Sequence, residues 1–390
     1  MSNDVIPFNK PYLTGRELAY IAKAHEGNML AGDGPFTGRC HQWLEENTGC
    51  ARALLTHSCT AAIEMAALLL NIQPGDEIIM PSFTFVSTAN AFVLRGGVPV
   101  FVDIRRDTLN LDESLLEAAI TSRTKAIVPV HYAGVACEMD TIADIAKRHR
   151  LSLVEDAAQG VMSSYKGRAL GSIGDLGCFS FHETKNVISG EGGALLVNNP
   201  ELAVRAELIR EKGTDRSRFF RGEVDKYTWQ EMGSSYLPGE LIAAFLWAQL
   251  EDAESITAGR LASWNYYHDL LTRLESEEKL QCPFIPKDRQ HNAHMYFVLL
   301  GKEVDRRAVL SELALNEVHA VSHYVPLHSS PAGTHYGRVH GSMKVTDEQA
   351  SRLIRLPLWT GISPQQQDRV VDVLDQVISR NTRSAGKKPD

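Results

Sequence analysis

Short apolar runs alternate with longer amphipathic stretches through the first half of the chain. The runs that predict strands lie at 53–56, 77–82, 98–103, 125–132 and 151–156. The stretches that predict helices lie at 60–70, 87–95, 112–120 and 139–149. Because strands that are apolar along their whole length are buried on both faces, this alternation predicts a mainly parallel sheet covered by helices on both sides. In such a sheet, ligands bind at the carboxyl ends of the strands.

The regular alternation weakens toward the middle of the chain. Apolar runs at 178–181 and 193–198 predict two strands around a glycine-rich turn, and a helix is expected at 200–212. Residues 213–240 show no regular period, and a long helix is predicted from 241 to 275. The remainder mixes short strands with helices, which indicates a second, smaller folding unit.

We therefore expect two domains and a tail. The large domain is predicted at 1–245, a smaller α+β domain at 246–382, and a disordered polar tail at 383–390. In the large domain, Thr14 and Glu17 have the spacing of a capping box and predict a helix that ends near His25. The glycine-rich stretch 27–38 is interpreted as a loop in an N-terminal arm.

Composition narrows the class of protein. The chain has 390 residues, of which 44% are apolar and 23% charged, so it has enough apolar material for two folded domains. The formal net charge of −8 argues against general binding to nucleic-acid phosphates. The six cysteines form no C-x-x-C pair, and neither a signal peptide nor an 18-residue apolar segment is present, so we expect a cytoplasmic protein.

Two residues at strand ends have side chains suited to catalysis. Asp156 ends the strand 151–156, so its carboxylate is expected at the ligand edge, where a buried acid needs a cationic partner. The alternative is that Asp156 caps a following helix. Lys185 follows the strand 178–181, and an inward-facing amine there is desolvated, which lowers its pKa and lets it attack a carbonyl. Most lysines, however, are solvated surface charges.

Two further strand ends offer a phosphate site and an aromatic face. The amides of Thr60 and Ala61 lie at a predicted helix N-terminus, which favours phosphate, although an ordinary cap is the alternative. Phe85 follows the strand 77–82 and is able to stack on a planar ring, although such a residue is more often core. A phosphate site, a stacking face, an acid and an imine-forming amine together match pyridoxal 5'-phosphate (PLP).

The motifs that contain these residues resemble the DegT/DnrJ/EryC1/StrS sugar aminotransferases over about residues 5–375. They are Gly32–Thr37, Ser58–Ala61, Pro81–Asn90, Glu155–Gln159, and Ser180–Lys185 with Gly190–Gly193. The resemblance implies an α/β fold of type I, the aspartate-aminotransferase-like fold of PLP-dependent transferases. Its large domain has a mainly parallel sheet, and its smaller C-terminal domain is α+β.

The resemblance also implies roles for the matching residues. Lys185 forms the imine with the cofactor and moves protons, and Asp156 is the partner of the ring nitrogen. Phe85 and Gln159 lie on the two faces of the ring. The residues expected to hold the phosphate are Thr60, Ala61 and Ser180.

One motif departs from the family. Many members carry G-Y-N-x-R where this chain has Gly233–Leu237, so Ser235 replaces the asparagine that reaches the neighbouring subunit's cofactor phosphate. A serine hydroxyl donates the same kind of hydrogen bond with a shorter reach. Because the segments 213–240 and 27–38 are suited to reaching across to another chain, we expect a homodimer with shared active sites.

A basic segment at 210–226 has two interpretations. Arg216 and Arg221 are candidate ligands of a nucleotide diphosphate, which arginine binds bidentately. Alternatively, the segment is a solvated loop whose charge is offset by its acidic neighbours. Tyr324 and His328 lie in a stretch that resembles a family segment near the sugar nucleotide. The histidines between 319 and 340 lack a ligand spacing, so no metal site is expected.

Within the family, the stretches Val130–Cys137 and Phe181–Asn186 carry the closest resemblance. They imply conversion of dTDP-4-keto-6-deoxy-D-glucose to dTDP-4-amino-4,6-dideoxy-D-galactose with glutamate as amino donor, a step of enterobacterial common antigen synthesis. The alternatives are amination of another nucleotide-linked keto sugar and a PLP-binding regulator without catalysis. Lys185 disfavours the family's dehydratases, which carry histidine there, and the absence of a basic helix-turn-helix segment disfavours the regulator.

Overall fold

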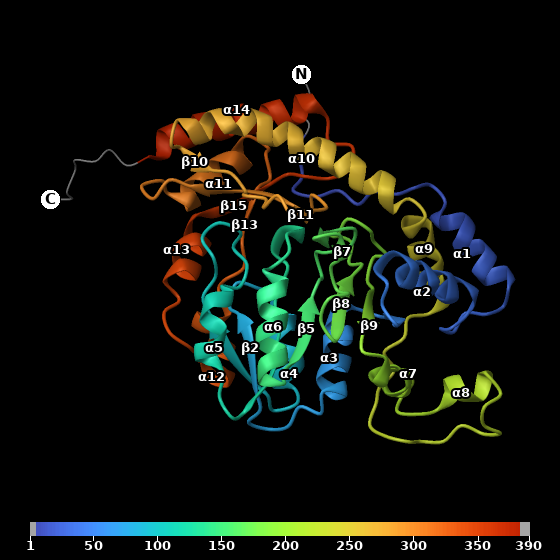
Figure 1. Ribbon diagram of the computed structural model, residues 1–390. Coiled ribbons are helices and arrows are strands. Elements are labelled where there is room, and N and C mark those ends of the chain that lie inside the picture. Colours follow the sequence, from blue (N-terminus) through green and yellow to red (C-terminus); the bar gives the residue numbers. More distant parts are fainter. Residues whose placement is uncertain (1–4, 383–390) are drawn as a thin grey trace.

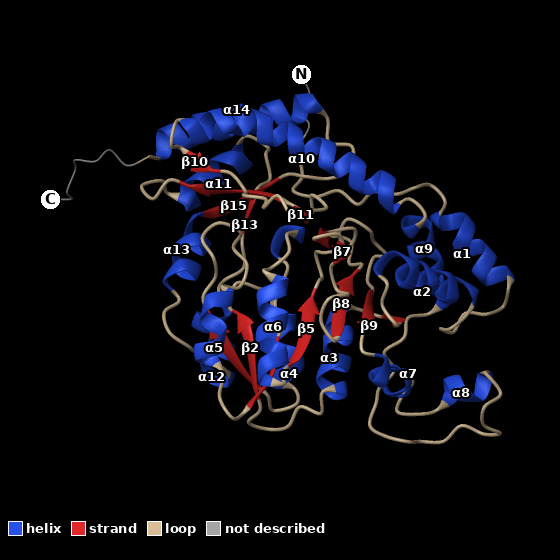
Figure 2. Ribbon diagram, viewed as in Figure 1, coloured by secondary structure: helices blue, strands red, loops and turns tan. Residues whose placement is uncertain are grey.

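The computed structural model of the protein describes residues 5–382. A large eight-stranded sheet lies between helices, and a four-stranded sheet beside it is covered by the long helices α10 (Ala253–Ser276) and α14 (Pro364–Asn381) (Figures 1 and 2). None of the helices in residues 5–382 is long and apolar enough to cross a membrane. The predicted tail at 383–390 lies outside the described residues.

The large sheet has the strand order β1-β9-β8-β5-β4-β2-β3-β14. Its strands are β1 (Arg52–Thr56), β2 (Glu77–Pro81), β3 (Val98–Val102), β4 (Thr124–Ile127), β5 (Ser152–Asp156), β8 (Leu176–Ser180), β9 (Gly193–Val197) and β14 (Arg338–Val339). Only β9 runs antiparallel to its neighbours β1 and β8, and the other pairs are parallel. The prediction of a mainly parallel sheet in a type I fold is confirmed.

Helices cover both faces of this sheet and join its strands. They are α1 (Glu17–Glu26), α2 (Pro35–Thr48), α3 (Cys59–Leu69), α4 (Val86–Val93), α5 (Leu116–Ala119), α6 (Met139–His149), α7 (Ala203–Arg210) and α9 (Glu240–Leu250). The short α8 (Arg216–Phe220) contacts α7 and lies away from the sheet (Figure 1). The prediction of one continuous helix over 241–275 was wrong, because the helix is interrupted between Leu250 and Ala253. Its first part, α9, packs on α1 and α2, whereas α10 packs on α14.

Helix α2 occupies part of the stretch that we expected to be a glycine-rich loop. Its first amides are capped by the buried carboxylate of Glu240, which accepts hydrogen bonds from Gly34 at 3.1 Å, Phe36 at 2.8 Å and Thr37 at 3.0 Å. Because this cap comes from a residue far along the chain, no local signal marks the helix start. The loop prediction was therefore wrong from Pro35 onward.

The smaller sheet has the order β10-β12-β15-β13. Its strands are β10 (Leu280–Gln281), β12 (Tyr296–Leu300), β13 (Val321–Ser322) and β15 (Leu353–Leu356), and its remaining helices are α11 (Arg306–Leu315), α12 (Pro331–Tyr336) and α13 (Lys344–Arg352). Apolar side chains from this sheet, α10 and α14 form one buried cluster. We propose that this cluster is the core of the small domain, with the division at 245 and 246 kept as a proposal.

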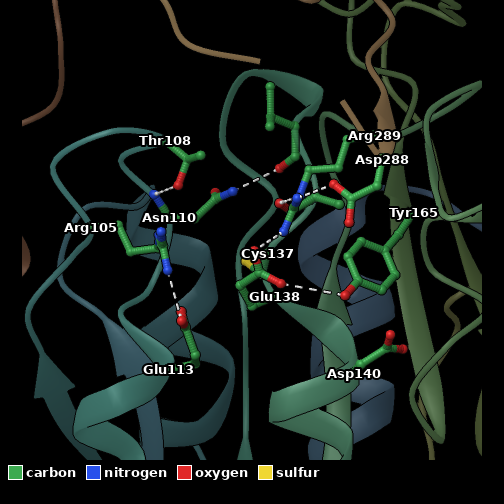
Figure 3. A network of polar contacts seen from close by, with 12 residues as sticks. Arg105, Thr108, Asn110, Glu113, Cys137, Glu138, Asp140, Tyr165, Asp288 and Arg289 are labelled. Atoms are coloured by element: carbon green, nitrogen blue, oxygen red, sulfur yellow. Dashed lines mark hydrogen bonds and ion pairs between the residues drawn. The ribbon is translucent and has the colours of Figure 1, made fainter. Parts of the chain in front are cut away.

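A third sheet, of β6 (Ser164–Tyr165), β7 (Arg168–Ala169) and β11 (Arg289–Gln290), joins the two parts. Beside it, polar contacts hold the loop after β4 in place (Figure 3). Asn110 donates to the carbonyl of Val135 at 2.9 Å, and Arg289 pairs with Glu138. The Asn110 amide oxygen also accepts the backbone N–H of Tyr132 at 2.9 Å. This network therefore fixes the position of a tyrosine that lines the functional site.

Candidate active site

A cavity of about 400 Å³ opens at the carboxyl ends of the central strands, between the large sheet and residues of the smaller one. Its lining includes Ser58, Cys59, Thr60, Phe83, Phe85, Ser87, Thr88, Tyr132, Asp156, Gln159, Ser180, Lys185, His323 and Tyr324. The fold therefore brings together seven of the residues that the sequence proposed, namely Thr60, Phe85, Asp156, Gln159, Ser180, Lys185 and Tyr324. Six of them lie at or just after strand ends that meet at one edge of the large sheet, and Tyr324 follows β13 of the smaller sheet.

Asp156 is the acid of this cavity. Its carboxylate accepts hydrogen bonds from the Thr88 hydroxyl at 2.6 Å and from the Ala158 amide at 3.1 Å. The Thr84 hydroxyl lies 2.7 Å from that of Thr88 and donates to it, because the only hydroxyl hydrogen of Thr88 is directed at Asp156. Two donors leave the carboxylate able to accept a further N–H from the cavity. Turns, rather than a helix, follow Asp156, so it does not cap a helix.

Lys185 lies in a tight turn just after β8. Its amide donates to the carbonyl of His182 at 2.9 Å, and the amide of Glu183 donates across the loop to the carbonyl of Gly190 at 2.8 Å. Burial lowers the pKa of the Lys185 ammonium from its ordinary value. The negative charge of Asp156 opposes this shift in pKa, and the positive charge of Arg355 adds to it. The cavity thus favours the free amine, which is the nucleophilic form.

The N-terminus of α3 forms another wall. Ser58 caps the helix by accepting the Ala61 amide at 3.1 Å, so this amide is already engaged within the chain. In the described part of the chain, the amides of Cys59 and Thr60 make no hydrogen bond, and a helix N-terminus of this kind favours phosphate. A Cβ on Gly193 would lie 2.4 Å from the Cys59 nitrogen, so only glycine allows β9 to pass so close.

The remaining walls supply an aromatic ring and polar groups. The Phe85 ring is 51% exposed and lies 5.1 Å from that of Tyr324. The Gln159 side chain is fixed because its carbonyl oxygen accepts the Ala133 amide at 2.6 Å, and Ser180 lies beside Lys185 in the lining. An acid, an amine of lowered pKa, a free helix N-terminus and an aromatic ring in one cavity fit PLP.

Five of the predicted residues do not line this cavity in the single chain, namely Ala61, whose amide is bound to Ser58, together with Ser235, Arg216, Arg221 and His328. Ser235 forms a β-bridge with Glu211, on the far side of α7. Arg216 and Arg221 line a second hollow of about 540 Å³ between the loop before α2 and α8. They pair with Glu211 at 3.2 Å and with Glu207 at 2.9 Å. Within one chain, the basic segment is thus offset by acids, as the solvated-loop interpretation expected.

His328 is also engaged elsewhere. Its ring lies 2.7 Å from the Ser82 hydroxyl and 3.3 Å from the Asp347 carboxylate, and it does not line the cavity. Conversely, Thr88, Tyr132 and His323 line the cavity, although the sequence did not indicate them as site residues. Thr88 and Tyr132 lay within motifs that were noted, but nothing in their spacing shows that they face Asp156 or His323, which are distant in the sequence.

Comparisons with known proteins agree with this geometry. The sequence model of the DegT/DnrJ/EryC1/StrS aminotransferase family matches residues 11–375. GDP-perosamine synthase of Caulobacter vibrioides is 33% identical over 370 residues, which cover 94% of this chain and 97% of that protein.

Solved structures are also similar to this chain. The PLP form of the putative sugar aminotransferase Spr1654 from Streptococcus pneumoniae is 25% identical, with a TM-score of 0.89 and coverage of 97% of this chain and 98% of that chain. DesI, solved in the presence of its TDP-sugar product, is 27% identical, with a TM-score of 0.86 and coverage of 97% and 94%.

Proposed function

Because this chain belongs to the DegT/DnrJ/EryC1/StrS aminotransferase family, we propose that it aminates dTDP-4-keto-6-deoxy-D-glucose to dTDP-4-amino-4,6-dideoxy-D-galactose, with glutamate as amino donor. The protein is a PLP-dependent sugar-nucleotide aminotransferase. The observation that carries the proposal is the meeting of Lys185, Asp156 and the N-terminus of α3 in one cavity.

When bound, PLP supplies an aldehyde that condenses with amines and a pyridinium ring that accepts the electron pair released at the substrate carbon. We propose that the Asp156 carboxylate would keep a proton on the ring nitrogen, since hydrogen bonds from Thr88 and Ala158 hold it in place facing the cavity. The free amides of Cys59 and Thr60 would hold the phosphate, together with the hydroxyls of Thr60 and Ser180.

Lys185 has two tasks in this proposal. Its free amine would hold the cofactor, and the same nitrogen would move a proton to and from the reacting carbon of the substrate. Burial supports both tasks, because it lowers the pKa of Lys185 and so raises the fraction of free amine near neutral pH. Phe85 at the cavity mouth would limit the entry of water and present an aromatic face.

Two kinds of observation support the proposed substrate. The stretches Val130–Cys137 and Phe181–Asn186 resemble the transaminase that makes dTDP-4-amino-4,6-dideoxygalactose for enterobacterial common antigen. Two of the similar proteins are also named for nucleotide sugars, one a GDP sugar and the other a TDP sugar. Because pocket shape decides between nucleotides, amination of another nucleotide-linked keto sugar is the second candidate. We propose a cytoplasmic step of polysaccharide synthesis.

We also propose that the protein is a homodimer whose active sites are shared. The segment that follows α7 exposes large apolar side chains, among them Phe220 and Trp229, the latter 80% exposed. Apolar exposure of this kind is typical of an interaction surface. In the dimer, Ser235, Arg216 and Arg221 would act on the partner's cofactor or nucleotide. An active monomer found by light scattering would contradict this proposal.

The substrate proposal is tested by incubating the purified holoenzyme with glutamate and a panel of nucleotide keto sugars. Mass spectrometry should detect amination of dTDP-4-keto-6-deoxyglucose, and NMR of the product should show the axial amine of the galactose configuration. An equatorial amine would indicate the glucose configuration. Binding of nucleotide sugars without amination of any would favour the regulator, and amination only of GDP- or UDP-linked sugars would overturn the choice of nucleotide.

A further inference from the structure

A third hollow, of about 620 Å³, lies where α10 and the segment after β10 meet the large domain. Its walls include Asp107, Trp264, His268, Glu275, Phe284 and His291. A narrow recess adjoins it through three of these residues and reaches Ala133 and Val135, in the loop after β4. Among residues 5–382, this hollow shares no lining residue with the catalytic cavity, so it is a separate site. We call it the junction hollow.

Aromatic rings form one side of the junction hollow. Trp264, His268 and Glu275 lie on one face of α10, because spacings of four and seven residues return to the same side of a helix. The Trp264 ring stacks on that of His268, with ring centres 4.9 Å apart, and meets the His291 ring edge-on at 4.6 Å. Burial and the nearby His268 lower the pKa of His291 to about 4, so this ring is uncharged near neutral pH. Phe284 adds a further ring, which is 51% exposed.

The junction hollow also carries negative charge. Asp107 and Glu275 are its acids, and no lysine or arginine among residues 5–382 lines it. Asp107 is balanced, because the Arg105 guanidinium donates to it at 3.0 and 2.9 Å. Glu275 is not balanced: within the same residues its carboxylate accepts only the Cys282 amide, at 2.8 Å, and joins no ion pair. A half-buried carboxylate of this kind is stabilised when a cation from outside reaches it.

The recess connects the junction hollow to the catalytic cavity through the loop 131–137. Ala133, in the recess, donates its amide to the Gln159 side chain at 2.6 Å. Gln159 lines the catalytic cavity, and so does Tyr132, the residue before Ala133. With a φ of 57°, Ala133 has a left-handed backbone conformation that costs free energy, so its contacts must hold it there. A ligand against this loop would therefore help to fix two walls of the catalytic cavity.

We propose that the junction hollow binds a small organic cation with a flat, aromatic body, and that the bound cation strengthens cofactor binding in the catalytic cavity. The rings match the flat body and attract a cation to their faces, and Glu275 supplies the opposite charge. Anions such as nucleotides are disfavoured, because no lysine or arginine in residues 5–382 lines the hollow. A metal ion is disfavoured too, since the described part of the chain has no group of three side chains able to hold one. This second site goes beyond the proposed function.

The first experiment compares three probes that differ in charge. Benzyltrimethylammonium is a cation that cannot form an imine, so it does not react with PLP in the holoenzyme. Benzyl alcohol is its neutral counterpart, and phenylacetate is the anionic one. Calorimetry with the wild-type holoenzyme should show that the cation binds at least about tenfold more tightly than either of the other two.

Variants test whether Glu275 supplies the charge. Glu275→Gln keeps an acceptor for the Cys282 amide and removes the charge, so the affinity for benzyltrimethylammonium should fall about tenfold. Glu254→Gln, which removes an exposed charge from the same helix, is the matched control and should leave the affinity unchanged. Phe284→Leu keeps apolar bulk but removes a ring face, so the affinity should fall about threefold.

Hydrogen exchange followed by mass spectrometry locates the bound cation in the wild-type holoenzyme. Benzyltrimethylammonium should slow exchange in the segments 281–291 and 131–137 and leave the segment 58–61, at the N-terminus of α3, unchanged. Equilibrium dialysis then tests the link between the sites. Saturating cation should lower the dissociation constant of PLP about fivefold, and because such coupling is reciprocal, the holoenzyme should bind the cation more tightly than the apoprotein by the same factor. Glu275→Gln should show no such change at the same cation concentration.

The opposite results would overturn the proposal. No binding of the cation, equal or tighter binding of benzyl alcohol or phenylacetate, or an affinity that Glu275→Gln leaves unchanged would show that the hollow is not a cation site. Slower exchange at 58–61 alone would place the cation in the catalytic cavity instead. Binding in the junction hollow with an unchanged affinity for PLP would overturn the link between the two sites. None of these outcomes depends on whether dTDP-linked keto sugars are aminated.

Discussion

Glu155 and Asp156 are neighbours on β5, but their carboxylates point to opposite sides of the sheet because side chains alternate along a strand. Glu155 is fully buried, and its oxygens accept amides of the segment 171–174 at 2.6 to 2.9 Å and the His131 ring at 2.9 Å. Among residues 5–382, Asp156 accepts hydrogen bonds from two donors, and it faces the cavity. A carboxylate whose acceptor sites are all used holds a loop in place, whereas a carboxylate with acceptor sites left is available to a ligand.

Other charged groups also differ in whether their bonding partners lie within the chain. The guanidinium of Arg338 forms hydrogen bonds of 3.0 and 2.8 Å to the carboxylate of Glu77, which lowers the pKa of Glu77 to about 2. Arg355 has no such partner in residues 5–382, and Lys185 is likewise outside any ion pair in this part of the chain. Asp156 and Lys185, which line the cavity, therefore keep bonding capacity that Glu155 and Glu77 have already used within the chain.

The largest effect is expected at Lys185. Lys185→Ala should reduce transamination by at least about 1,000-fold, because the covalent link and the proton transfer both need an amine at this place. The free energy of unfolding should change little, since the wild-type ammonium makes no ion pair in the described chain. Single-turnover kinetics with glutamate checks the rate, and urea denaturation checks the fold. If the variant kept a tenth of the wild-type activity, Lys185 would not be the amine that the reaction requires.

Asp156→Asn should have the next largest effect on activity. An amide holds the ring nitrogen protonated far less well than a carboxylate, so we expect cofactor to bind while turnover falls about 100-fold. Equilibrium dialysis of the cofactor and steady-state assays measure the two quantities. Near-normal rates would show that Asp156 only organises its turn through Thr88 and Ala158.

Glu155→Gln should show the opposite pattern. Removing the charge weakens the bonds from His131 and the 171–174 amides, so we expect the free energy of unfolding to fall by about 3 kcal/mol. The folded fraction should keep kcat within about threefold of wild type, because Glu155 does not line the cavity. A loss of kcat as large as that in Asp156→Asn, without a loss of stability, would contradict the contrast between the two sides of β5.

The smallest effect concerns pH. Because the Arg355 charge helps to lower the pKa of Lys185, Arg355→Met should raise that pKa and shift capture of PLP by the apoprotein to higher pH. In the wild-type apoprotein the folded-state pKa lies below the unfolded value of 10.5, so the unfolded chain binds more protons between the two values. Stability should therefore rise with pH through that window, by less in the variant. If the pH dependence of PLP binding were unchanged in the variant, the charge of Arg355 would have no effect on the pKa of Lys185.

The sequence predicted the parts of the site that depend on local order. Asp156 and Lys185 each follow a buried strand, and the carboxyl ends of parallel strands meet at one edge, so their proximity followed from the strand pattern. Arg355, His323 and Tyr132 were not predicted as a group, because their meeting depends on how the smaller sheet packs against the large one. Helix α2 was missed for the same reason, since its cap, Glu240, lies about 200 residues away.

The central claim is that Lys185 is the amine that binds the cofactor in this cavity. Reduction of the wild-type holoenzyme with borohydride, followed by proteolysis and mass spectrometry, locates the link directly. We expect one pyridoxyl-modified peptide, with the modification on Lys185, and none in Lys185→Ala. Modification of a different lysine in the wild-type protein, or an unchanged modified peptide in the variant, would contradict it.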